Sequence, residues 1–253
     1  MFNQALTKQL TMIYDKRPLP SYVVVEDIRR PFFFEIETST EDTPGRAGHT
    51  YRRQNYGKRT IEVDLRIIVD SMPNQYENRE KVRALTKSLR AYFFKDRPRP
   101  LVLSDQPSTY DMAIPESFDI HQAGVSALIT VHFLVPEGFS RAGNAAITNF
   151  PEAGSSIFYT GDLETPLDIQ GTATGASVRV QNLTSGERID LLRLTPGKLI
   201  QIDGEKECVR QGDLLAMTSL AAGSDFPWLI KGENQIEISG LKDIEIRYEG
   251  RYL

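Results

Sequence analysis

The residue types from which most active sites are built are scarce in this chain of 253 residues. It contains one cysteine and three histidines, His49, His121 and His132, which lie far apart. It has no HExxH pattern, no paired cysteines, no Asp-x-Asp-x-Asp-Gly loop and no glycine-rich loop that follows a strand and opens a helix. We therefore predict no catalytic residues, no metal site and no cofactor. A chain of this kind is expected to bind or assemble rather than to be an enzyme.

Long hydrophobic runs are also missing. The longest apolar stretches, such as 126–135, are far shorter than the roughly 20 residues that a membrane-spanning helix needs. The N-terminus lacks the basic start and apolar run of a signal peptide. A single cysteine, Cys208, excludes an internal disulfide and is expected to be a buried or half-buried hydrophobe. We expect a soluble protein made in the cytoplasm, with no membrane insertion.

Charge is distributed unevenly along a chain whose composition is typical of a globular protein with a sizeable core. Residues 1–137 hold 19 basic and 18 acidic residues, whereas residues 138–253 hold 11 and 16, so the net charges are +1 and −5. The segment 136–149 has little periodicity, and we place the boundary between two domains, 1–137 and 138–253, at its start. The acidic second half argues against nucleic-acid binding there, because Lys and Arg make most phosphate contacts.

The first half is predicted to be a sheet with one packed helix. An apolar stripe that includes Val82, Leu89 and Phe93 predicts a helix over about 75–94, and Pro98 prevents its extension. Leucines and isoleucine at helical spacing in 2–14 suggest a short docking helix or an interface arm. Alternating or β-branched runs predict strands at 19–30, 32–38, 59–67, 100–103, 110–115 and 125–135.

The second half is predicted to be an antiparallel β-sandwich. Short alternating segments recur about every ten residues, and turn signals such as Pro196-Gly197 and Asp203-Gly204 separate them. No helical pattern competes with them. The predicted strands are 167–170, 177–182, 188–191, 199–203, 226–230, 234–238 and 244–248.

Several short motifs recur in a specific order along almost the whole chain. In the first half they are Pro100 to Asp105 with Pro107 and Tyr110, after the helix bearing Arg79-Glu80, and Pro136-Glu137-Gly138-Phe139. In the second half they are Asn182 with Thr184 and Gly186, Gly197 before 199–203, and Phe226 to Leu229 with Gly232, Asn234 and Ile236. In this order and spacing the chain resembles the distal tail proteins of long non-contractile-tailed (siphovirus) bacteriophages that infect Gram-positive hosts.

The resemblance implies an architecture, a location and a set of partners. The N-terminal domain would be β-sandwich-like with one packed helix, and its copies would close into a homohexameric ring around a channel. The C-terminal domain would be a galectin-like or carbohydrate-module-like sandwich outside the ring. Such a ring, which can also stack on a second one, is the hub between the tail tube protein and the tail-tip or adsorption protein at the distal end of the tail in the virion. DNA would pass through the channel without sequence recognition.

A ring of identical subunits needs two different complementary surfaces on each copy. The polar stretch 39–59 is predicted to be either a long solvated loop or an extended hairpin that reaches a neighbour. The segment 19–30 offers an edge strand as another route. Within the polar stretch, the candidate contacts between subunits are the basic residues Arg46, Arg52, Arg53, Lys58 and Arg59.

Two other functions compete with the hub. A carbohydrate-binding module fused to an assembly domain would recognise host cell-wall glycans through exposed aromatic faces, for which Trp228, Tyr159 and Tyr248 are candidates. The alternation of Trp228 with Phe226 predicts that the indole points into the core instead. A wall hydrolase would need an acid and base pair of carboxylates, but most Asp and Glu occupy alternating solvent positions.

Overall fold

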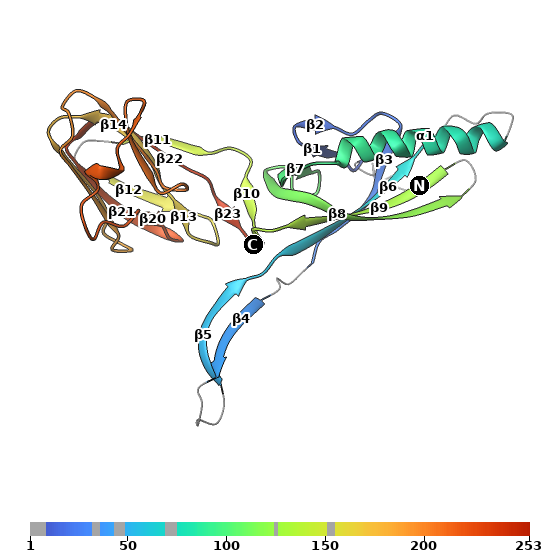
Figure 1. Cartoon of the computed structure of the whole chain (residues 1–253), viewed down its shortest axis with the longest axis horizontal. Coiled ribbons are helices and arrows are strands. Elements are labelled where there is room, and N and C mark those ends of the chain that lie inside the picture. The colour runs from blue at the N-terminus through green and yellow to red at the C-terminus, as the bar shows by residue number, and fades with distance from the viewer. Residues whose placement is uncertain (1–8, 32–35, 43–48, 69–74, 124–125, 151–154) are drawn as a thin grey trace, which may run out of the picture. The chain divides into compact units, whose positions relative to one another are not determined.

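A computed structural model describes the chain except for residues 1–8, 32–35, 43–48, 69–74, 124–125 and 151–154. Its contacts divide the chain into two compact units, Met1–Ser140 and Arg141–Leu253 (Figure 1). None of the helices in the described parts is long and apolar enough to cross a membrane. The domain boundary expected between residues 137 and 138 remains a prediction, because a domain boundary separates parts of a chain that fold independently.

The first unit is an antiparallel sheet with the strand order β2-β1-β7-β8-β9-β6-β3, accompanied by helix α1 (Figure 1). The predicted strand 59–67 and helix are confirmed as β6 and α1, whereas the strand predicted at 110–115 is much longer. The elements are β1 (Met12–Tyr14), β2 (Arg17–Pro18), β3 (Val23–Arg29), β6 (Arg59–Ile67), α1 (Gln75–Phe93), β7 (Arg99–Leu103), β8 (Thr109–Ala123) and β9 (Ser126–Val135).

The core of the first unit follows from the two-residue alternation of its central strands. Ile61, Val63 and Leu65 on β6 are fully buried, while the residues between them are half-buried. Helix α1 contributes Val82 and Phe93 to the same cluster, as its apolar stripe predicts. Tyr14, also buried, packs its ring against the rings of Phe93 and Phe133.

The N-terminal segment 2–14 was expected to be a docking helix or an interface arm, and the helix is wrong at its C-terminal end. Met12–Tyr14 forms strand β1, which pairs with β7. The helical spacing of the apolar residues was overridden by ladder pairing with a strand some 90 residues later, which buries Met12 and Tyr14. Residues 1–8 of the predicted helix lie outside the described part of the chain.

The polar stretch between β3 and β6 contains an extended hairpin. Strand β4 (Ile36–Asp42) pairs with β5 (His49–Tyr56) in a register that runs from Ile36↔Tyr56 to Asp42↔His49. These two strands form a sheet of their own among the described elements. Figure 1 shows that the hairpin continues beyond the ends of β3 and β6. Residues 32–35 of the strand predicted at 32–38 are not described. We call the β4–β5 hairpin the arm.

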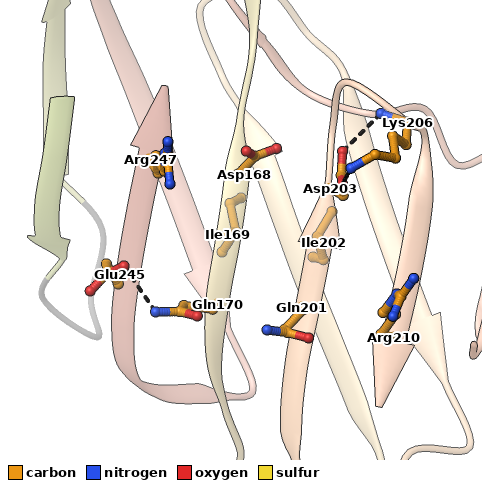
Figure 2. Close-up of a pocket in the computed structure, with 10 residues that line it drawn as sticks. All are labelled: Asp168, Ile169, Gln170, Gln201, Ile202, Asp203, Lys206, Arg210, Glu245 and Arg247. Atoms are coloured by element: carbon orange, nitrogen blue, oxygen red, sulfur yellow. Dashed lines mark hydrogen bonds and ion pairs between the residues drawn. The ribbon is translucent and has the colours of Figure 1, made fainter. Parts of the chain in front are cut away.

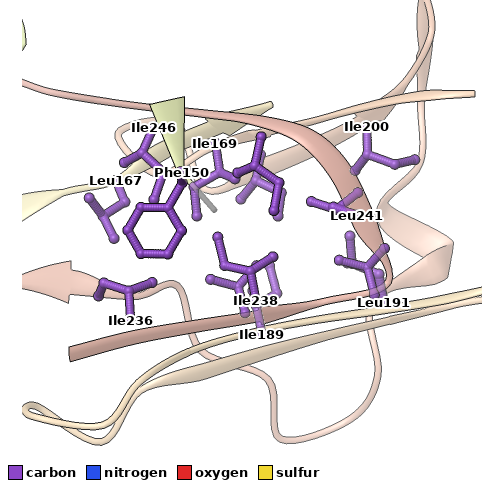
Figure 3. Packing of buried hydrophobic residues seen from close by; sticks show 14 of the residues in the cluster. Phe150, Leu167, Ile169, Ile189, Leu191, Ile200, Ile236, Ile238, Leu241 and Ile246 are labelled. Atoms are coloured by element: carbon purple, nitrogen blue, oxygen red, sulfur yellow. The ribbon is translucent and has the colours of Figure 1, made fainter. Parts of the chain in front are cut away.

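The second unit is the predicted β-sandwich. Two sheets with the orders β11-β22-β14-β17-β18-β19 and β12-β21-β15-β16 enclose a core of aliphatic side chains (Figure 3). The larger sheet consists of β11 (Ala146–Phe150), β14 (Asp168–Ala173), β17 (Leu199–Asp203), β18 (Cys208–Gln211), β19 (Leu214–Leu215) and β22 (Leu241–Tyr248). The smaller sheet consists of β12 (Ser155–Tyr159), β15 (Ser177–Asn182), β16 (Arg188–Leu192) and β21 (Gly232–Ser239).

Short elements complete the second unit, and one of them, β10, begins at the last residue of the first unit. Most of these elements lack the alternation from which a strand can be predicted. The segment predicted as a strand at 226–230 is reduced to β20, and Cys208 is half-buried, as expected. The short elements are β10 (Ser140–Ala142), β13 (Thr165–Pro166), the 3-10 turn η1 (Met217–Ser219), β20 (Trp228–Leu229) and β23 (Arg251–Tyr252). β10 pairs with β23, and β13 with β20.

Two fully buried asparagines fix the loop before β21. The Nδ2 atom of Asn182 donates to the Trp228 carbonyl at 2.6 Å and to Oδ1 of Asn234 at 3.2 Å. Asn234 holds Ile230 by both backbone groups, accepting from its N–H at 3.0 Å and donating to its carbonyl at 2.7 Å. Oδ1 of Asn182 accepts from the Thr184 N–H, which begins the turn at Thr184. The two asparagines that belong to the sequence motifs therefore hold the backbone of this loop in place by hydrogen bonds.

We expect Asn234→Ala to lower the free energy of unfolding by about 2–4 kcal/mol, because it leaves buried backbone groups of the loop without partners. Urea unfolding measures this. The matched control is Asn149→Ala on the exposed face of β11, expected to change stability by less than about 0.5 kcal/mol. Equal shifts for the two variants would contradict the role of Asn234.

Candidate functional site

The base of the arm is built on a buried ionic cluster in the first unit. The Asp111 side chain on β8 is 1% exposed. Its Oδ2 accepts a hydrogen bond from Nη1 of Arg30 at 2.9 Å, and its Oδ1 accepts from Nη2 of Arg59 and from Oγ of Ser140. Arg30 also donates from Nε to Asp105 at 2.6 Å. The carboxylate thus joins residues from four separate segments.

Nearby carboxylates offset the cost of burying the two guanidinium charges of this cluster to different degrees. Burial opposes the charge of Arg30, but Asp105 and Asp111 together outweigh it, and the pKa of Arg30 is raised above its ordinary value. Burial dominates at Arg59, and its pKa is lowered although Asp111 attracts the charge. Nε of Arg59 has no hydrogen-bond partner among the described residues. Asp111 is therefore the carboxylate that balances the buried charge of the Arg59 guanidinium.

The structure distributes the predicted subunit contacts over different environments. Arg46 lies outside the described residues, and Arg52 and Arg53 belong to β5, where only the backbone is described. Lys58 is exposed just before β6. Arg59, with 6% exposure, makes its hydrogen bonds within the chain. A role for these five residues between subunits remains a prediction.

The polar face of the first unit's sheet carries a second ionic network. Arg29 at the end of β3 contacts Glu62 and Asp64 on β6 at 2.9 and 2.5 Å. The hydrogen bond from Arg29 lowers the pKa of Asp64, and Oδ1 of Asp64 also accepts from Thr130. His132 lies 2.9 Å from Asp119. The alternating carboxylates of β6, expected at solvent positions, thus pair across strands rather than form an isolated acid and base pair.

An apolar hollow of about 400 Å³ lies between the end of α1 and β8 in the first unit. The Phe94 side chain is 85% exposed beside it, and Phe118 and Ile120 are each more than one third exposed. Arg90 and Lys95 add positive charge to the lining. Exposed aromatic and aliphatic groups gathered at one place are typical of surfaces that bind another protein.

A polar groove of about 320 Å³ crosses the outer face of the larger sheet in the second unit (Figure 2). Strands β14, β17, β18 and β22 supply its lining. Gln170 donates to Glu245 at 2.9 Å, and Lys206 pairs with Asp203 at 2.6 Å. The remaining polar side chains are those of Asp168, Gln201, Arg210 and Arg247. The groove combines donors, acceptors and both signs of charge.

Two neighbouring carboxylates of the groove have oppositely shifted pKa values. Burial raises the pKa of Asp168, although the Gly204 N–H donates to its Oδ1 at 3.1 Å. Burial acts on Asp203 as well, but hydrogen bonds from the ammonium and the backbone N–H of Lys206 outweigh it, and its pKa is lowered. The groove therefore becomes more negative as the pH rises through the pKa of Asp168.

The aromatic candidates for sugar binding do not form an exposed platform. Tyr159 is 2% exposed and donates its hydroxyl to the Leu163 carbonyl. Tyr248 is half-buried and packs edge-on against the Tyr159 ring. Trp228 is half-buried rather than fully in the core, and the Arg251 guanidinium lies 5.4 Å from its ring centroid. None of the three offers the open ring face on which a sugar would stack.

No cluster of side chains suited to holding a metal ion occurs among the residues that the structure describes. The candidate functional features are instead three surfaces: the arm, the apolar hollow and the polar groove. These features can bind protein or polar ligands.

Two known families match the chain, one in each unit. The family described as phage tail protein RIFT-related domain matches residues 12–135, and the family described as siphovirus-type tail component, C-terminal domain, matches residues 160–252. The chain belongs to the siphovirus distal tail protein (Dit) family. It is thus a component of a phage tail, as its motifs predict. No curated protein sequence matches it.

One solved structure confirms that the fold is mainly β and Dit-like. The crystal structure of SPP1 Dit, described as a paradigm of the hub adsorption apparatus in phages that infect Gram-positive hosts, is similar with a TM-score of 0.82. The identity is 17%, over 97% of this chain and 100% of that one. Two structures of the phage P2 baseplate in its activated conformation, with Ca and with Sr, have TM-scores of 0.47 and 0.46 at 11% identity. They cover 96% and 95% of this chain, and 97% of each matched chain.

The opposite pKa shifts in the groove predict opposite effects of amide substitution. Because the folded-state pKa of Asp168 is raised, its contribution to stability is fully present below its unfolded value and is lost as the pH rises through the folded value. We expect Asp168→Asn to raise the melting temperature at pH 7 and this gain to shrink towards pH 4.

Asp203→Asn serves as the contrast, because the lowered pKa of Asp203 contributes stability at neutral pH. This variant is expected to melt below the parent chain at pH 7, with a deficit that shrinks in acid. Thermal unfolding by circular dichroism at both pH values measures the two differences. The same sign for both variants would contradict the assignment.

Proposed function

We propose that this Dit family member is the hub of a phage tail tip. Six copies form a ring that joins the tail tube protein to the adsorption apparatus and leaves a channel through which DNA passes without being read. The N-terminal half, predicted as 1–137, forms the ring, and the sandwich faces outward. The observation that carries the proposal is the pair of family matches, one in each unit, supported by the fold likeness to SPP1 Dit.

The arm supplies the first of the two surfaces that a closed ring requires. A two-stranded hairpin is marginally stable by itself in water, and β4 and β5 pair only with each other among the described strands. Each strand therefore has a free backbone edge that can pair with another chain. A second copy that binds the arm would stabilise it and close the ring.

The second surface has to lie elsewhere on the same domain, because a heterologous contact joins two different patches. The apolar hollow beside Phe94 meets this need with exposed rings and aliphatic groups. The basic residues Arg46, Arg52, Arg53, Lys58 and Arg59 remain our candidates for contacts on the arm side. Protein binding is all that the hub requires, and the proposal includes no catalysis and no cofactor.

Shortening the arm tests the ring. Residues 37–55 are replaced with Asn-Gly, so that Ile36 and Tyr56, which are paired in the register, are joined by a two-residue turn. We expect the parent chain to sediment at six times the monomer mass, or twelve times when rings stack. The shortened chain is expected to stay monomeric at the same concentrations, because it lacks one interface.

The control is Thr38→Ala with Ser39→Ala, which changes two exposed arm side chains but keeps the backbone edges. It should assemble like the parent. The proposal fails when the shortened chain forms the same ring, or when the parent remains a monomer at tens of micromolar in the presence of its tail tube protein.

The polar groove favours a second candidate function, the binding of a host cell-wall glycan by the sandwich. Amide, carboxylate and guanidinium groups side by side in Figure 2 match the donors and acceptors of sugar hydroxyls. The function is the alternative expected from the sequence, but the proposed binding residues differ, because the aromatic candidates are packed and the groove has no ring in its lining.

A glycan array with the full-length chain tests this candidate. We expect saturable binding that Gln201→Ala combined with Arg210→Ala weakens at least tenfold, about 1.4 kcal/mol. The matched control is Trp228→Ala, outside the groove, which should leave the affinity unchanged. Absence of saturable binding, or binding lost through Trp228→Ala alone, would count against the groove.

A further inference from the structure

The two chain segments that lead into and out of the arm are tied to one buried carboxylate. Arg30 follows β3 directly, Arg59 is the first residue of β6, and the arm lies between them in the sequence. Both guanidinium groups donate to Asp111 on β8. Strand β9 lies between β8 and β6 in the sheet. The carboxylate therefore reaches past a neighbouring strand to hold both sides of the arm's base.

Backbone pairing alone leaves the direction of the arm open. The ladder between β3 and β6 ends at Arg29↔Glu62, so the first three residues of β6, 59–61, have no partner on β3. Beyond it, Arg59 pairs only with Val135 of β9 among the described residues, and the arm strands pair only with each other. The hydrogen bonds from the Arg30 side chain to Asp111 and Asp105 hold the segment that leads into the arm to the rest of the unit.

We propose that Asp111 is the positioning residue that sets the direction of the arm. This inference rests on the proposed function, in which the arm contacts a second copy of the chain. Seven or eight residues of strand span about 25 Å, so a rotation of about 10° at the base moves the tip by about 4 Å. Hydrogen bonds between strand edges tolerate only a fraction of that displacement. A small rotation of the arm at Asp111 is therefore enough to break the hydrogen-bond register between the arm and the second copy.

A purely stabilising role is the alternative that the experiment must separate. Removing one member of a buried ionic cluster destabilises a fold whatever else the cluster does, because a charge remains without its partner. Replacing the whole cluster by apolar residues of similar volume can leave stability nearly unchanged while removing the directional bonds. Direction and stability can therefore be measured independently.

The direction of the arm is measured by the distance between two spin labels. In a Cys208→Ser background, cysteines replace Thr38 on the arm and Lys87 on α1, both exposed. Labelled chain is diluted into unlabelled chain so that only distances within one copy are read. We expect one narrow distance distribution for the parent and a broadened or shifted one for Asp111→Asn.

Two further variants make the result decisive. Asp111→Leu with Arg59→Met and Ser140→Ala replaces three members of the cluster with apolar residues and leaves Arg30 paired with Asp105. We expect this triple variant to melt near the parent temperature but still to give the broadened distribution. Asp15→Asn removes an ion pair of 2.9 Å with Lys95 elsewhere in the first unit and should keep the narrow one. Parent-like distributions in both Asp111 variants would overturn the inference, and the triple variant alone decides when Asp111→Asn does not fold.

Assembly is scored separately, by sedimentation of the same variants without labels. We expect Asp111→Asn and the triple variant to raise the concentration of half-assembly at least about tenfold, and Asp15→Asn to leave it unchanged. A disordered arm together with normal ring assembly would support Asp111 as the anchor and contradict the arm's role in the ring. An ordered arm together with lost assembly would contradict the anchor itself.

Discussion

A polar group that leaves water must find a partner inside the protein, and both units depend on clusters that meet this requirement. In the first unit the Asp111 carboxylate pairs with Arg30 and Arg59, and Asp105 pairs with Arg30 as well. In the second, Asn182 and Asn234 satisfy backbone groups at the junction of β20 and β21, where the pairing of β20 with β13 ends. In each place the hydrophobic core supplies most of the stability, and the polar cluster decides where a connecting segment lies.

The position of these clusters explains how a β-rich fold can serve assembly. Both lie where regular strand pairing stops, at the base of the arm and at the loop before β21. Beyond such points a segment can project from the sheet and still keep a defined start. The fold likeness to SPP1 Dit does not by itself assign partners, because one fold hosts many functions. The arm, the apolar hollow and the polar groove are the places where those partners would be chosen.

The local pattern of apolar residues was sufficient to predict a helix or strand wherever one face of that element is buried. Strand β6 and helix α1 were predicted nearly to the residue, because periods of two and 3.6 record which side meets the core. Strand β8 was predicted too short, since residues 116–121 are exposed on both faces of the strand and no buried face marks them. The N-terminal helix was wrong because Met12 and Tyr14 gain burial by pairing with β7, a contact that no local window contains.

The sequence alone predicts the mainly β class, the helix and the sandwich of the second half, since these depend on periodicity, and it indicates the Dit family through the order of its short motifs. It also identified a basic polar stretch at the arm, but not its anchor. Only the tertiary structure brought Arg30, Arg59 and Ser140 to Asp111, from positions 81, 52 and 29 residues away along the chain. No local pattern records such a meeting, because an isolated Asp or Arg looks the same in a sequence whether folding buries it beside its partner or leaves it in water.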